Sequence, residues 1–135
     1  MSTDAILKPN ITITQTDANR LMLLAEKNES TISSVVEVLY AELDRARVVP
    51  DEAISSDVIR MGSYARFSGN SGPSRQITLV YPGKADIALD RLSILTPIGV
   101  ALIGLSKGQS MDWQTRDGRI QRLVVEAVTP PLEKA

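Results

Sequence analysis

The amino-acid sequence predicts an α+β fold in which a short N-terminal antiparallel helical hairpin precedes a small antiparallel sheet that carries one helix. Up to about Arg47, apolar residues recur at the spacing of two amphipathic helices. Beyond Asp57 the pattern changes to short alternating runs, and Asp117-Gly118 between two such runs is typical of a β-hairpin turn. A length of 135 residues with 43% hydrophobic residues is sufficient for a packed core.

The two N-terminal helices are predicted from their caps and their apolar stripes. The first helix is expected to begin after Thr16 or Asp17, because both side chains are competent N-caps. A second helix is expected at about Ile32–Arg47 after a short polar break, which together indicate an antiparallel hairpin. Glu42 and Arg45 are spaced i,i+3, so we expect them to pair on the outer face of this helix.

Short strands are predicted before and after the hairpin. Each is a run of apolar or β-branched residues that alternates or is bounded by turn residues, and Gly69–Pro73 is a dense turn signal within the series. The expected strands are Val58–Met61, Tyr64–Ser68, Arg75–Tyr81, Leu92–Leu95, Ser110–Thr115 and Ile120–Val128, and Asn10–Thr14 is expected to be a short edge strand or an extended lead-in.

One further helix is predicted between the last strands. Thr96 is a suitable N-cap, and Pro97 occupies the first helical position, where its missing N–H costs nothing. An apolar face then follows the i, i+3, i+4, i+7 spacing, at Ile98, Ala101, Leu102 and Leu105. The pattern predicts a helix that covers one face of the sheet, with Leu102 fully buried beneath it.

The sequence indicates a division into two parts, with residues 1–50 as the coiled-coil-like helical hairpin and residues 57–135 as the sheet domain. Pro50 ends the second helix, and the segment that follows is typical of a linker. Residues 1–56 carry nine acidic and five basic side chains, whereas residues 57–135 carry seven and ten. Such charge asymmetry often accompanies two structural parts, so we expect the sheet domain to fold alone.

Composition excludes several classes of function. The chain has no cysteine and no histidine, which removes disulfides, thiolate catalysis, serine–histidine triads and almost every transition-metal site. The net charge of −1 gives no signal for binding a polyanion. The N-terminus lacks the pattern of a secretory signal, and the longest apolar run is too short to cross a bilayer. We therefore expect a cytoplasmic protein without membrane contact, and no cofactor.

The segment from Thr96 to Gly104, followed by Lys107-Gly108, resembles the signature S-P-I-G-x-A-L-L-G-K…G-D in the C-terminal domain of the Gre transcript-cleavage factors. Leu79–Asp86 is similar to the loop that precedes this signature. The resemblance extends from about Asn10 to Val128, and the short hairpin, with Ala41–Ala46 near its end, is most similar to the branch that regulates nucleoside diphosphate kinase. It implies an FKBP-like C-terminal unit, an antiparallel sheet wrapped around one helix.

The resemblance also implies what the hairpin lacks. In Gre factors a long helical hairpin enters the secondary channel of RNA polymerase, and an acidic pair at its tip helps to hold a catalytic magnesium ion. Here the expected helices are short, and the tip offers Glu26, Asn28 and Glu29 without two adjacent acids. We expect Glu29 to be a solvated loop residue, no metal to bind, and no transcript cleavage, so the protein is predicted not to be an enzyme.

The resemblance still implies docking on the polymerase, although it does not imply cleavage. The positions that match the family's docking segment are Leu95, Thr96, Pro97 and Ile98, although Leu95 stands where the family often has a polar residue. The prediction is a monomeric, non-enzymatic transcription regulator that binds RNA polymerase near the secondary channel, competes with Gre factors and affects nucleoside diphosphate kinase levels. Contact with nucleic acid is expected to be indirect, within the transcription complex.

Two alternative functions stay open on the sequence. An FKBP-like peptidyl-prolyl isomerase needs an aromatic-lined pocket, and the chain has five aromatic residues. Direct binding to nucleoside diphosphate kinase is neither supported nor excluded by the residues. Trp113 is interpreted as a core residue rather than a stacking platform. Arg116, Arg119 and Arg122 are interpreted as a solvated strand edge rather than a phosphate site.

Overall fold

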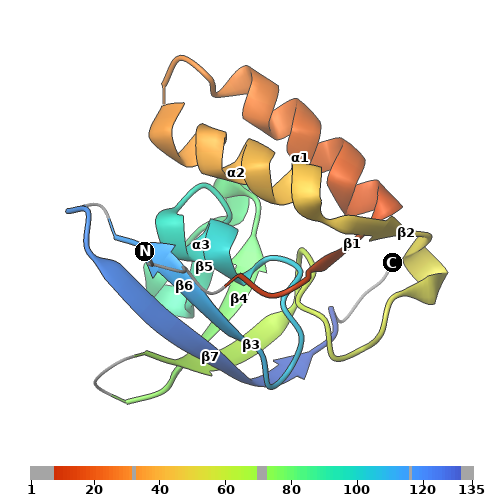
Figure 1. Cartoon of the computed structure of the whole chain (residues 1–135), viewed down its shortest axis with the longest axis vertical. Coiled ribbons are helices and arrows are strands. Elements are labelled where there is room, and N and C mark those ends of the chain that lie inside the picture. Colours follow the sequence, from red (N-terminus) through yellow and green to blue (C-terminus); the bar gives the residue numbers. More distant parts are fainter. Residues whose placement is uncertain (1–7, 32, 70–72, 116, 132–135) are drawn as a thin grey trace, which may run out of the picture.

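The computed structural model describes residues 8–31, 33–69, 73–115 and 117–131. The central part of the predicted turn at Gly69–Pro73, and Arg116, lie outside these residues. Two N-terminal helices lie side by side above a five-stranded sheet, and a short third helix lies between them and the sheet (Figure 1). The predicted α+β class is confirmed, whereas the FKBP-like character of the sheet unit stays a prediction.

The N-terminal helices are flanked by two short strands. The elements are β1 Thr12–Thr14, α1 Gln15–Lys27, α2 Ser33–Arg45 and β2 Arg47–Val49. The cap of α1 was expected at Thr16 or Asp17, which is wrong, because the Thr14 hydroxyl accepts a hydrogen bond from the Asp17 N–H at 3.1 Å. Asp17 lies inside the helix instead, where it is buried and its Oδ2 accepts a hydrogen bond from the Met61 N–H at 3.0 Å.

The end of the second helix differs from the prediction in the same way. Helix α2 ends at Arg45 rather than Arg47, and β2 pairs in parallel with β1. The Arg47 N–H donates to the Ile11 carbonyl at 3.0 Å. Two β-branched residues before Pro50 favour extended backbone, which explains why the chain leaves the helix early.

The five-stranded sheet has the order β5-β4-β3-β7-β6. Its pairs are antiparallel except for β4 and β5, which run parallel because residues 81–90 carry the chain back before β5 begins. The expected strand at Val58–Met61 is wrong: Val58 forms only an isolated bridge to Ser106, and the Ile59 N–H donates to the Leu105 carbonyl at 2.8 Å. The strands are β3 Tyr64–Ser68, β4 Arg75–Val80, β5 Arg91–Ser93, β6 Ser110–Gln114 and β7 Ile120–Thr129.

The turn between β6 and β7 confirms the hairpin predicted at Asp117-Gly118. The Thr115 N–H donates to the Arg119 carbonyl at 2.9 Å, and Gly118 adopts a φ of +90°, which glycine reaches without steric cost. This turn holds the ends of the two strands close to the start of the third helix.

Helix α3 (Pro97–Leu102) is buried on two sides rather than one. The predicted cap is confirmed, because the Thr96 hydroxyl accepts a hydrogen bond from the Gly99 N–H at 3.0 Å. Leu102 is fully buried as expected, but Val100 is fully buried too, whereas Ile98 of the predicted apolar face is only half-buried. Contacts of α3 with both α2 and β6 explain the difference.

The buried residues of both parts form one continuous cluster. Leu21 and Leu39 of the helix pair belong to the same core as Leu79 of the sheet and Leu102 of α3. The segment Asp51–Ala53, expected as linker, forms a short 3-10 turn, and the Asp51 carboxylate accepts a hydrogen bond from the Thr16 N–H at 3.0 Å. The division into residues 1–50 and 57–135 stays a prediction. Because the two parts share this core, separating them would expose buried residues of both.

Candidate functional site

Three of the four predicted docking residues lie at an accessible surface. Thr96, Pro97 and Ile98 are half-buried at the start of α3, and they line a cavity of about 450 Å³. Leu95 is only 7% exposed and belongs to the core, so its side chain supports this segment from below rather than facing a partner. The cavity is completed by residues of β6 and of the β6–β7 turn, namely Trp113, Thr115, Asp117 and Arg119.

Local hydrogen bonds hold the start of α3 in place. The Ser93 hydroxyl accepts from the Leu95 N–H at 3.0 Å, and the Thr96 hydroxyl donates to the Ser93 carbonyl at 2.8 Å. Since the same Thr96 oxygen also accepts from the Gly99 N–H, the hydroxyl is occupied as both donor and acceptor. Thr96 is therefore a structural cap, and Pro97 and Ile98 provide the partly exposed apolar surface beside it.

The β6–β7 turn forms the opposite wall and is itself held by charged and polar contacts. Arg119 Nε lies 3.2 Å from Asp117 Oδ2, and the Thr115 hydroxyl donates to the Asp117 carboxylate. The hydroxyl contact, followed by the hydrogen bond from the Arg119 N–H, lowers the pKa of the Asp117 carboxyl. These contacts hold the wall in place, and the acidic Asp117 and the basic Arg119 lie at its rim.

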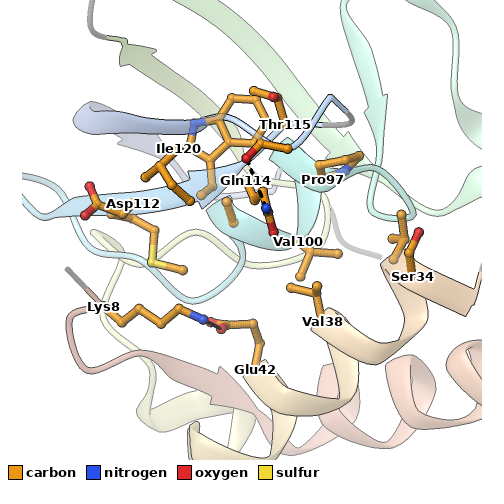
Figure 2. Close-up of a pocket in the computed structure, with 15 residues that line it drawn as sticks. Lys8, Ser34, Val38, Glu42, Pro97, Val100, Asp112, Gln114, Thr115 and Ile120 are labelled. Carbon is orange, nitrogen blue, oxygen red and sulfur yellow. Dashed lines mark hydrogen bonds and ion pairs between the residues drawn. The ribbon is translucent and has the colours of Figure 1, made fainter. Parts of the chain in front are cut away.

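A second cavity, of about 560 Å³, adjoins the first between α2 and the β6–β7 hairpin. Figure 2 shows Val38 of α2 and Val100 of α3 near each other on one side, with Ile120 and Thr115 on the side of the sheet. The two cavities share Pro97, Trp113 and Thr115. We call them together the docking groove.

Trp113 lies in the middle of the docking groove. Its ring is half-buried and packs against the core, as the sequence indicated, but it also lines both cavities. The contribution of α2 was missed on the sequence, although the spacing of Val35 and Val38, which lie three residues apart, was a signal. Val38 is 47% exposed.

Glu42 was expected on the outer face of α2, which is wrong, because its side chain is fully buried at the edge of the groove. Arg45 Nε and Nη2 donate to Glu42 Oε1 at 3.1 and 2.8 Å, so the expected i,i+3 pair exists but faces inward. Lys8 Nζ lies 3.6 Å from Glu42 Oε2 (Figure 2).

The predicted tip residues serve the structure of the helix pair. Asn28 ends α1, with its N–H donating to the Ala25 carbonyl at 3.1 Å and its side-chain amide to the Leu24 carbonyl at 2.9 Å. The Glu29 carboxylate accepts a hydrogen bond from the Tyr40 hydroxyl, which raises the pKa of Tyr40 to about 12. Glu29 is thus more than a solvated loop residue.

The described part of the chain contains no group of three acidic side chains that could hold a metal ion, and Glu26 is exposed and makes no hydrogen bond there. None of its helices is long and apolar enough to cross a membrane. Of the arginines considered for phosphate, Arg122 is engaged with Asp112 at 2.7 Å, and Arg119 with Asp117. Both of these arginines are therefore paired with a carboxylate of the β6–β7 hairpin.

The sequence of this chain matches two known families. Residues 54–130 match the family described as the C-terminal part of the transcription elongation factors GreA and GreB, and residues 9–49 match the Rnk N-terminus. The chain is 37% identical over 119 residues to the regulator of nucleoside diphosphate kinase of Escherichia coli K12, covering 87% of this chain and 88% of that protein. It is also 30% identical over 88 residues to GreA of Thermodesulfovibrio yellowstonii, covering 64% of this chain and 56% of that protein.

A solved structure with the same fold agrees with these matches. The prokaryotic transcription elongation factor GreA/GreB from Nitrosomonas europaea superimposes with a TM-score of 0.72 at 37% identity, over 89% of this chain and 99% of that one. The groove described above includes Thr96–Ile98 of the signature segment, within the matched C-terminal residues. The chain therefore belongs to the GreA/GreB family of transcription factors, in the branch that carries the Rnk N-terminus.

Proposed function

We propose that this protein is a non-enzymatic transcription regulator that binds RNA polymerase near its secondary channel through the docking groove and competes there with Gre factors. The observation that carries this proposal is the position of Pro97 and Ile98, signature residues that lie at the surface beside Trp113. Partly exposed apolar and aromatic side chains beside a charged rim are typical of protein–protein contact surfaces.

The same structure supports binding without transcript cleavage. Helices α1 and α2 have 13 residues each, so each is about 20 Å long at 1.5 Å per residue. Asn28 and Glu29 are engaged within the helix pair, and Mg²⁺ needs several hard oxygen ligands in tight geometry. A short pair with such a tip offers no second metal site at the polymerase active centre.

The effect on nucleoside diphosphate kinase follows from the relative that carries this activity in its name. We propose that the kinase level changes through transcription, and that the protein acts in the cytoplasm together with the polymerase. Direct binding to the kinase is the alternative, which a pull-down with purified kinase distinguishes. A prolyl isomerase is the other alternative, although Trp113 is the one aromatic residue among those that line the groove.

Binding of core RNA polymerase to matched isoleucine variants tests the proposal. Ile98→Asp places a charge in the docking groove, and we expect it to weaken binding at least tenfold. Ile87→Asp is the control, because Ile87 is 90% exposed and does not line the groove. We expect this variant to bind within twofold of the wild type.

A titration with labelled Gre factor on a backtracked complex completes the test. The protein should displace the Gre factor by mass action at a shared site and should leave the transcript intact. Simultaneous binding of both proteins would refute the shared site. Cleavage that disappears in Glu29→Ala would refute the argument from the hairpin tip.

A further inference from the structure

Glu42 is a buried carboxylate with one oxygen that lacks a hydrogen bond. Its side chain has no exposed surface, and Oε1 accepts both hydrogen bonds from Arg45, which also donates to the Pro9 carbonyl at 2.6 Å. Oε2 accepts no hydrogen bond from any residue that the structure describes. The 3.6 Å to Lys8 Nζ is an ion-pair distance beyond that of a good hydrogen bond.

The cavity that Glu42 borders has a mostly apolar lining. Val38, Val100, Met111 and Ile120 line it, and its volume of about 560 Å³ is sufficient for a long side chain. The other acid that lines the cavity, Asp112, is held by Arg122 at 2.7 Å. Glu42 Oε2 is therefore a buried acceptor with remaining hydrogen-bonding capacity at this end of the groove.

We propose that this end of the groove binds an arginine or lysine side chain of the polypeptide that docks at Thr96–Ile98. The cationic head would donate to Glu42 Oε2, and its aliphatic stem would lie against Val38 and Ile120, which are both exposed in the cavity. A buried acceptor without a donor is costly, so a charged donor that reaches it gains a strong hydrogen bond. The inference rests on the proposed function, because it assigns a second contact to the same partner.

Lys8 is the internal competitor for this position. Figure 2 shows its ammonium group facing the Glu42 carboxylate, and its side chain is 42% exposed, so it can move into solvent when a partner side chain enters. This arrangement makes a directional prediction: removing the Lys8 side chain should strengthen binding of a cation in the groove. A merely structural ion pair would show no such gain.

A small-molecule titration tests the cation site without polymerase. Trp113 is the only tryptophan in the chain and lines the cavity, so its fluorescence reports on binding there. Butylguanidinium should change the emission saturably, whereas the neutral and isosteric butylurea should not at equal concentration. Lys8→Ala should bind butylguanidinium about three- to tenfold more tightly, and the surface control Lys84→Ala should equal the wild type.

Glu42→Gln should abolish the response to butylguanidinium, with its folding checked by circular dichroism. Where that variant does not fold, the gain in Lys8→Ala carries the test. An equal response to butylurea would show an apolar pocket only and would overturn the cation site. The absence of any gain in Lys8→Ala would also overturn it.

Polymerase binding by the same variants tests the source of the cation. We expect Lys8→Ala to bind polymerase more tightly and Glu42→Gln to bind at least tenfold more weakly. If Ile98→Asp weakens polymerase binding while both of these variants leave it unchanged, the inference is refuted and the docking proposal stands. If butylguanidinium binds but neither the wild type nor any variant binds polymerase, the proposed function is refuted. The assignment of the cation to a side chain of the polymerase is then refuted as well.

Discussion

Gly104 lies against Ile11 and Thr12 at the N-terminal side of the molecule, and its replacement by alanine tests the shared core. Gly104 adopts a φ of +82°, and its carbonyl accepts a hydrogen bond from the Thr12 N–H at 3.1 Å. A Cβ added here would lie 2.9 Å from Ile11 Cβ and 3.2 Å from the Thr12 carbonyl oxygen. The first contact is closer than real Cβ atoms tolerate, and it involves a side-chain atom fixed to the backbone.

Gly108 provides a matched control, because it has a φ of +90° but no atom within 4 Å of an added Cβ. Alanine at Gly108 pays only for the left-handed backbone, about 1 kcal/mol. Alanine at Gly104 is destabilised in addition by overpacking, typically by about 1–3 kcal/mol, for a total of about 2–4 kcal/mol. The difference between the two variants isolates the contact between Gly104 and Ile11.

Thermal unfolding and urea denaturation measure both variants. At about 2.1 cal/mol/K of unfolding entropy per residue, a chain of 135 residues loses about 3.5 °C in Tm for each kcal/mol. We expect Gly108→Ala to lower the Tm by about 3–4 °C and Gly104→Ala by about 7–14 °C. Equal losses would refute the close packing of Ile11 on Gly104 and the junction that it forms.

The same junction bears on the proposed division of the chain. The fragment 57–135 keeps Gly104 and α3 but lacks Ile11 and helix α2, which contacts α3. We still predict a cooperative thermal transition for this fragment, at a lower Tm than that of the full chain, because the sheet and Leu102 retain a core of their own. A fragment without any transition would show that residues 1–50 and 57–135 form one unit.

Three further outcomes follow from the buried and hydrogen-bonded side chains. Leu102→Ala should lower the free energy of unfolding by about 2–5 kcal/mol in urea, and a loss below about 0.5 kcal/mol would contradict the burial of α3. Burial raises the pKa of the Asp17 carboxyl, so the native state retains its proton more tightly than the unfolded chain. The free energy of unfolding of the wild type should therefore fall as pH rises from about 4 through the native pKa, and Asp17→Asn should lack this fall. Urea unfolding at pH 4–7 measures both proteins. The same pH dependence in Asp17→Asn as in the wild type would refute the assignment. Glu29→Ala should return the Tyr40 pKa from about 12 toward 10 in an absorbance titration, with polymerase affinity unchanged, whereas an unmoved titration would contradict the Tyr40–Glu29 hydrogen bond.

The features that could be predicted from the sequence depend on neighbouring residues. The cap of α3 is made between Thr96 and Gly99, and the β6–β7 turn closes between Thr115 and Arg119. Both are contacts over three or four residues, so their geometry follows from the local side chains and backbone preferences. The strand and helix patterns, and with them the fold class, could be read for the same reason.

The features that only the tertiary structure decided depend on residues far apart in the chain. The β1–β2 pair joins Thr12 to Arg47, and this contact replaced the predicted last turn of α2 with a strand. Glu42 was expected on an outer face, but Arg45 and the distant Lys8 lie over its carboxylate, which is fully buried and borders the groove. Helical spacing identifies which residues share a face, whereas the packing of other elements decides which face is buried. The sequence by itself therefore determined the fold class, most of the elements and the cap at Thr96, and the packing of α2 against α3 decided that the signature at Thr96–Ile98 lies in a groove with a buried acid.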